Sequence, residues 1–283
     1  MKTILLTIIA ASLGAPAAVF TASGALASDI QASVDSFRAA LGANNGVGGS
    51  FATGRREINW DGVSDAFSAP NQLPGNFFNV NSPRGVVMST PGTQLQVSAN
   101  AASGTPVEFG NLNAGYPAHI TPFSAQRLFT PLGSNIVDIQ FFIPGTNTPT
   151  SVLGFGAVFT DVQTAAGTLF TVFYANGDNG GQFAVPANAA AGGFSFLGLT
   201  DSVNRYSRIR IQSGQVDLGS GITQNLQANL DVVAMDDFIY GEPFNAAAGV
   251  PEPASVVLIG AGLGCWLSSA AANTGGIRVP DLI

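Results

Sequence analysis

The chain has 283 residues, of which 46% are hydrophobic and only 10% charged, and its formal net charge is −7. Low charge together with 20 Phe residues favours a packed, β-rich protein over a disordered one. The acidic balance excludes the basic footprint of a nucleic-acid-binding protein, and the single Cys and single His exclude an intrachain disulfide and a multi-histidine metal site.

Residues 1–27 have the pattern of a secretory signal peptide. Lys2 is followed by the apolar run ILLTIIAASLGAPAAVF and by a small-x-small pattern at Ala25 and Ala27. This pattern predicts cleavage before Ser28 and export of the protein. The Gly and Pro residues that interrupt the run disfavour the alternative, an uncleaved membrane anchor.

The next segment predicts one short amphipathic helix over 29–41. A Ser or an Asp can cap its start and Gly42 ends it. One face of this helix carries its apolar residues, Ile30, Val34, Phe37 and Leu41.

The remainder, up to residue 245, has the periodicity of strands. IVDIQFFI and YSRIRIQSG alternate apolar and polar residues, and turn signals such as NGDNGG separate the apolar segments. We therefore predict an all-β domain over 28–245, a two-sheet antiparallel sandwich of jelly-roll type, with a closed barrel as the alternative. Residues 246–249 form a linker.

An acidic pair in VVAMDDFIYGEP marks the last of these strands, and the segment resembles the last core strand of several jelly-roll sugar-binding modules. Strict alternation would place Asp236 and Asp237 on opposite faces of the sheet. Asp161, at the end of another strand, could join them around a structural calcium ion, which takes six to eight oxygen ligands. The alternative is that these carboxylates accept backbone hydrogen bonds and fix a turn.

Two further residues, in REINWDGV, are candidates for ligand binding. An exposed Trp60 beside Asp61 could stack on a sugar ring, whereas a buried Trp60 would belong to the core. Catalysis has weaker signals, because His119 lies in a Pro-flanked loop and no serine has the Gly-x-Ser-x-Gly pattern. A glycan hydrolase would need two of the following carboxylates across a cleft: Glu57, Asp61, Asp161, Asp236, Asp237 and Glu242.

The C-terminal segment, 250–283, begins with Val250, Pro251, Glu252 and Pro253 and continues as an apolar run that predicts a helix. It resembles the PEP-CTERM sorting signal of exported bacterial proteins. That resemblance implies processing by an exosortase, transient membrane association, and a Gram-negative bacterium that makes extracellular polysaccharide. The arginine-rich tail of such signals is missing, and our hypothesis is that the sequence after Gly264 is read out of frame.

Segments between residues 37 and 243, including GRREINWDGV and FGAVFTDV, also resemble uncharacterised exported proteins of the PEP-CTERM group. The resemblance implies location and architecture rather than chemistry. We expect a non-catalytic protein of the cell surface or extracellular matrix, structural or adhesive, that contacts polysaccharide. The alternatives are a secreted glycan hydrolase and an ice-binding protein, although the regular Thr or Ala rungs of a flat ice-binding face are absent.

Overall fold

The computed structural model describes residues 17–245. Residues 1–16 of the predicted signal peptide, the linker 246–249 and the sorting segment 250–283, for which an apolar helix is predicted, lie outside the described residues. Over the part of the chain that is described, no helix has the length and apolar character needed to span a membrane.

The described residues are mainly strands joined by long loops. The strands are β1 (Ala18–Gly24), β2 (Arg55–Ile58), β3 (Val86–Ser89), β4 (Gln94–Val97), β5 (Phe129–Leu132), β6 (Ile136–Phe141), β7 (Gly154–Thr160), β8 (Leu169–Tyr174), β9 (Asn179–Ala184), β10 (Phe194–Thr200), β11 (Tyr206–Gln212) and β12 (Ala234–Gly241). The α-helices are α1 (Ala27–Leu41) and α2 (Phe77–Val80).

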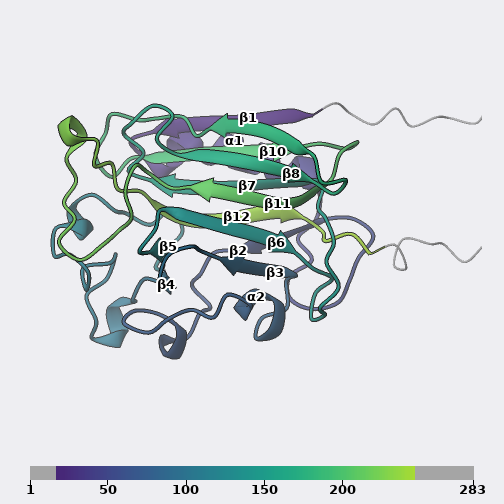
Figure 1. Cartoon of the computed structure of the whole chain (residues 1–283), viewed down its shortest axis with the longest axis horizontal. Helices are drawn as coiled ribbons and strands as arrows, with labels where there is room; N and C mark the ends of the chain where they lie inside the picture. The colour runs from purple at the N-terminus through teal and green to yellow at the C-terminus, as the bar shows by residue number, and fades with distance from the viewer. Residues whose placement is uncertain (1–16, 246–283) are drawn as a thin grey trace, which may run out of the picture. The chain divides into compact units, whose positions relative to one another are not determined.

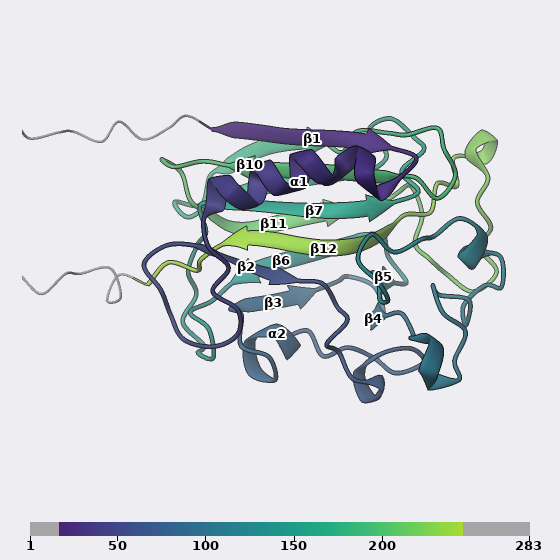
Figure 2. The ribbon, with the colours of Figure 1, turned by 180° about the vertical axis from the view of Figure 1, so that it is seen from behind.

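The strands form two antiparallel sheets. One has seven strands in the order β1-β10-β7-β12-β5-β4, with β2 also paired to β12, and the other has five in the order β3-β6-β11-β8-β9. Figure 1 looks onto the five-stranded sheet, and Figure 2 shows the seven-stranded sheet from behind with α1 lying on it. The all-β class with two antiparallel sheets is therefore confirmed.

From β5 onward the chain moves back and forth between the two sheets. Strands β5, β7, β10 and β12 belong to the seven-stranded sheet, while β6, β8, β9 and β11 belong to the five-stranded one. The spatial order β5-β12-β7-β10 therefore lies opposite β6-β11-β8-β9. Most neighbouring strands are distant in sequence, so the pairing is set by long-range contacts.

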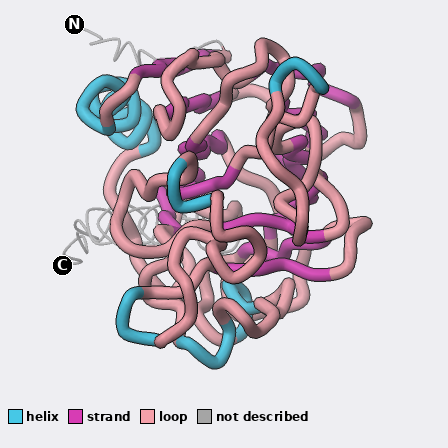
Figure 3. Tube along the Cα trace, turned by 90° about the vertical axis from the view of Figure 1, so that its left-hand side faces the viewer, coloured by secondary structure: helices cyan, strands magenta, loops and turns pink. Residues whose placement is uncertain are grey.

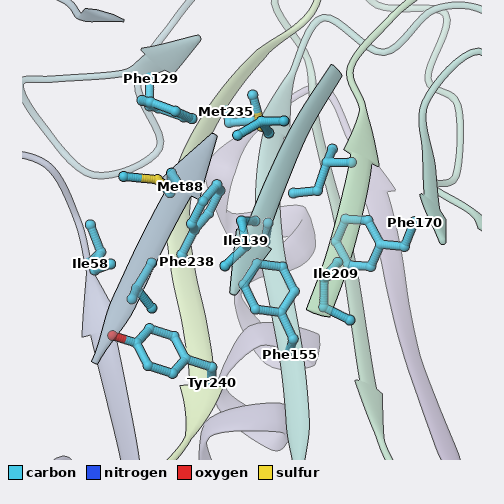
Figure 4. Packing of buried hydrophobic residues seen from close by; sticks show 14 of the residues in the cluster. Ile58, Met88, Phe129, Ile139, Phe155, Phe170, Ile209, Met235, Phe238 and Tyr240 are labelled. Atoms are coloured by element: carbon cyan, nitrogen blue, oxygen red, sulfur yellow. The ribbon is translucent and has the colours of Figure 1, made fainter. Parts of the chain in front are cut away.

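The main hydrophobic core lies between the sheets. Side chains of both sheets point toward one another there (Figure 4). The ring of Phe155 on β7 lies 5.5 Å from that of Phe170 on β8 and 5.4 Å from that of Phe238 on β12, in edge-to-face arrangements that aromatic pairs favour. Aromatic contacts thus join the two layers of the sandwich.

Helix α1 covers the outer face of the seven-stranded sheet (Figures 2 and 3). Its buried residues are those of the predicted apolar face: Ile30, Val34, Phe37 and Leu41. The Phe37 ring lies over Gly156 and Gly198, which pair across β7 and β10. A Cβ atom would come within 2.8 Å of this ring at Gly156 and within 2.7 Å at Gly198, so the two glycines leave room for the helix to pack on the sheet.

The helix starts two residues before its predicted start. The Asp29 carboxylate accepts a hydrogen bond of 2.9 Å from the backbone N–H of Leu26, and this interaction fixes the first turn. The end is as predicted, because Gly42 adopts a positive φ of 96° that favours glycine.

Strand β1 lies before the predicted cleavage site. All seven of its residues pair with β10, and Phe20 contacts Phe37 edge-on at 5.4 Å. Ala25 lies between β1 and α1, while Ala27 and Ser28 lie in the first turn of α1. Cleavage before Ser28 stays a prediction. It would remove β1, so that β10 would lack a paired strand on that side, and it would shorten α1.

The contribution of β1 can be measured with two chains, residues 18–245 and 28–245. We expect the shorter chain to melt at least about 5 °C lower, because it loses a seven-residue strand ladder and the apolar contacts of Phe20. Thermal unfolding followed by circular dichroism checks this. Val19→Ser in the longer chain is the control, since that side chain is exposed. Equal melting temperatures would show that β1 adds no stability, and N-terminal sequencing of secreted protein identifies the form that exists.

Candidate functional site

A β-bulge in β12 determines where the acidic pair lies. Met235 pairs with Phe159 and Phe238 with Ala157, so β12 has one residue more than β7 over this stretch. Because the extra residue breaks the alternation, the two carboxylates are not on opposite faces. Both reach the same hydroxyl, that of Ser124, at 3.1 Å from Asp236 and 2.7 Å from Asp237. The prediction of one carboxylate per face is therefore wrong.

Burial and mutual repulsion set the protonation of this pair. Burial raises the pKa of Asp236 well above its usual range, and the charge of Asp237 raises it further. Burial also raises the pKa of Asp237, while the hydroxyl of Ser124 and the charge of Arg38 lower it. Both shifts favour the protonated form of the carboxyl groups, and the Ser124 hydroxyl lies within hydrogen-bond distance of an oxygen of each.

The pair, on β12, connects this strand to the loop before β5, to α1 and, through Arg38, to β2. The other oxygen of Asp236 accepts hydrogen bonds from the backbone N–H groups of Phe123, at 2.6 Å, and Ser124, at 3.2 Å. One nitrogen of Arg38, on α1, lies 3.0 Å from carboxylate oxygens of both Asp237 and Glu57. We call Asp236, Asp237, Ser124, Arg38 and Glu57 the carboxyl clasp. It fastens β12 and β2 to the helix and to the loop before β5.

The second predicted pair, Trp60 and Asp61, supports the same loop. Asp61 accepts hydrogen bonds from the backbone N–H groups of Gln126 and Arg127. Trp60 is 1% exposed, stacks on Phe129 at 4.3 Å and donates a hydrogen bond to the backbone oxygen of Asp236. A ring so enclosed cannot stack on a sugar, so the ligand-binding role predicted for Trp60 is wrong. Trp60 is a core residue, which was the alternative.

Asp161 lies apart from the clasp, at the end of β7. It is fully buried with a positive φ of 68°, and one carboxylate oxygen accepts a hydrogen bond of 2.9 Å from Gly192. Its other oxygen and the Nδ1 atom of His119 are buried without a hydrogen-bond partner among the described residues. Burial raises the pKa of Asp161 to about 6, although the charge of His119 opposes this rise.

The described residues do not form the predicted calcium site. Between residues 17 and 245, no group of three or more His, Cys, Asp or Glu side chains is arranged to hold a metal ion. Asp236 and Asp237 are occupied by Ser124, by backbone N–H groups and by Arg38. The alternative from the sequence, carboxylates that accept hydrogen bonds and fix loops, describes them better.

Sequence reasoning missed the buried ion pair between Arg56 and Glu242. The guanidinium makes two contacts with the carboxylate, at 2.7 Å and 2.6 Å, and both side chains are almost fully buried. Arg56 also donates to the backbone oxygens of Gly46, Gly48 and Gly49. The only sequence signal is that its strand alternates, which places Arg56 on an inward position.

The outer face of the five-stranded sheet is a different kind of surface, because no helix of residues 17–245 lies across it and α2 contacts the edge strand β3 (Figure 1). We call it the open face. The side chains that point outward there include Asp138 and Gln140 on β6, Thr171 and Phe173 on β8, Gln182 on β9, and Arg208 and Arg210 on β11.

These outward side chains form two registered rows. In one, Gln140, Arg208 and Phe173 are cross-strand neighbours, and the guanidinium lies 3.7 Å from the centre of the phenyl ring. In the other, Arg210 lies between Asp138 and Thr171 and bonds to both oxygens of Asp138, at 2.9 Å and 2.7 Å. The rows place planar hydrogen-bonding groups beside an aromatic ring on one surface.

Comparisons of this chain with family models, curated proteins and solved structures find no match. The resemblance to PEP-CTERM proteins therefore stays a prediction from the residues alone.

The raised pKa of Asp161 gives a testable pH dependence. A raised carboxyl pKa means that the folded state favours the protonated form, so the stabilising contribution is complete below pH 4 and is lost as the pH rises through 6. Relative to Asp161→Asn, the unfolding free energy of the natural chain should fall by up to about 3 kcal/mol over this window. Urea unfolding at a series of pH values measures it. Asp178→Asn, on an exposed turn, should parallel the natural chain; if Asp161→Asn does so too, Asp161 does not titrate there.

Proposed function

We propose that this protein is an exported, non-catalytic β-sandwich that binds polysaccharide outside the cell and serves there as a structural or adhesive component. The observation that carries the proposal is the open face. This face presents amides, guanidinium groups and a phenyl ring in register.

The side chains on the open face suit a sugar polymer. Gln140 and Gln182 are exposed, and each side-chain amide offers two donors and an acceptor. Arg208 and Arg210 add planar donors, and their charge is only partly offset by Asp138. Phe173 contributes apolar surface beside them. A flat array of this kind fits successive rings of a chain better than it fits a small molecule, which needs a concave site.

The strand order supports the jelly-roll prediction. A jelly roll has eight strands in two four-stranded sheets, and β5-β12-β7-β10 facing β6-β11-β8-β9 has that order. We propose that the domain is a jelly roll extended by β1 to β4. Jelly rolls occur in lectin domains, which agrees with sugar binding but, as a likeness of fold, does not demonstrate it.

The rival functions have less support. A hydrolase needs a free carboxylate pair across a cleft. Glu57 is engaged by two arginines, Glu242 by Arg56, the Asp pair by Ser124, and Asp61 by backbone N–H groups, while Asp161 is fully buried. Two cavities in the described residues, one beside the end of α1 and one beside Trp60, are not lined by Asp236, Asp237 or Ser124. An ice-binding face would need regular Thr or Ala rows, and the open face has charged and amide rows instead.

Polysaccharide binding can be measured by affinity gel electrophoresis in gels that contain soluble bacterial exopolysaccharides. We expect the natural chain to be retarded in at least one gel, and Gln140→Ala combined with Phe173→Ala to weaken binding about tenfold, or 1.4 kcal/mol, because one row loses its amide and its ring. Gln31→Ala is the matched control, since it removes an amide from α1 on the other side of the sandwich.

Two results would contradict the proposal. One is that no polysaccharide retards the chain. The other is that the natural chain releases reducing ends from a polysaccharide that it binds, while Asp237→Asn does not. That result would favour the hydrolase.

The C-terminal segment supports export and sorting by an exosortase, as its Val-Pro-Glu-Pro motif predicts. Without an arginine cluster, little retains the apolar run in a membrane, so the chain as written should be released. A variant with an appended arginine cluster should stay with the membrane fraction and be processed. Fractionation and immunoblotting of expressing cells compare the two, with an appended glutamine cluster as control. Equal retention of all three would show that the basic tail is dispensable.

A further inference from the structure

An open cavity of about 730 Å3 lies where the last turn of α1 meets the ends of β10 and β12. Its volume is typical of small-molecule sites. Alanines and glycines of residues 39–54 form much of the wall, and the larger apolar side chains that line it are Phe20, Leu41, Phe51 and Leu153. The cavity belongs to neither the carboxyl clasp nor the open face.

The buried ion pair holds one wall of this cavity in place. Arg56 bonds to three backbone oxygens of the loop between α1 and β2, and Glu242 accepts from the backbone N–H of Phe51 at 3.2 Å and from Asn45 at 2.8 Å. Asn45 in turn donates to the backbone oxygen of Thr53. The loop therefore does not need to reorganise to form the wall, and Phe51 stays 44% exposed beside the cavity.

The negative charge beside the cavity is neutralised by an ion pair, whereas the positive charge is not. Among residues 17–245, the charged residues that line it are Glu242 and Arg205. The carboxylate of Glu242 is neutralised by Arg56, but Arg205 has no ion pair among residues 17–245 and only stacks on Phe244, at 4.2 Å. Partial burial lowers the pKa of Arg205. One uncompensated cation thus borders an apolar space.

We propose that this cavity binds a single-chain amphiphile with an anionic head group, of the class of long-chain carboxylates. The alkyl chain lies against Leu41, Phe51 and Leu153, none of which is removed by cleavage before Ser28, and the head group pairs with Arg205. Burial of the chain supplies the affinity, and the guanidinium supplies the preference for an anion. This proposal is independent of polysaccharide binding, which uses a different surface.

The test is isothermal titration of residues 18–245, which contain every described strand and the core, with monomeric dodecanoate and with dodecanol. We expect saturable one-to-one binding of dodecanoate. Arg205→Gln should weaken dodecanoate binding at least tenfold and leave dodecanol binding unchanged, because only the carboxylate uses the charge. Asp178→Asn, which also removes one charge but lies on an exposed turn outside the cavity lining, is the control and should bind like the natural chain.

A second variant tests the location. Ala40→Trp adds a bulky side chain at an exposed helix position that lines the cavity, so it should abolish binding of both ligands without unfolding the domain, as circular dichroism can verify. The proposal is overturned if dodecanoate does not bind, if Arg205→Gln binds it as tightly as the control, or if Ala40→Trp still binds it. Binding to phosphatidylglycerol vesicles without binding of the monomer would also overturn it, in favour of a membrane surface.

Discussion

The bulge in β12 is the constraint on which the rest of the domain depends. This strand lies in the middle of the seven-stranded sheet, between β7 on one side and β2 and β5 on the other. One extra residue turns both Asp236 and Asp237 toward Ser124 and α1, and the backbone oxygen of Asp236 accepts the indole N–H of Trp60. Buried carboxyl groups need partners, so the loop before β5, the helix and β2 are positioned by what the bulge buries.

The sequence predicts the regular parts of this fold well, because they depend on local periodicity. Alternation in IVDIQFFI and YSRIRIQ identifies β6 and β11, and the apolar face of α1 is the one that is buried. The bulge is not predictable in this way, because the faces of a strand are predicted by assuming unbroken alternation, and a bulge interrupts it. The placement of Asp236 and Asp237 on opposite faces was wrong for that reason. Among the described residues they do not join Asp161 in a group that could hold the calcium ion considered from the sequence.

Partners far apart in sequence are the other part that local patterns do not predict. Arg56 and Glu242 are 186 residues apart, and neither has a motif that indicates the other. Ser124, which joins the acidic pair, lies in a loop without any periodic signal. Alternation does identify the outward residues of β6 and β11, but it does not tell which sheet the helix covers. The open face therefore emerges only from the assembled fold.

The packing of Phe37 against two glycines limits which substitutions this sequence can accept in evolution. Two glycines from strands β7 and β10 leave room for one aromatic ring of the helix, and neither glycine tolerates a Cβ while that ring is present. The three positions, 37, 156 and 198, are therefore coupled: a larger residue in the sheet requires a smaller one on the helix. Among divergent homologues this triplet should change together, and its correlated substitution would identify distant members of the fold when overall sequence similarity no longer does.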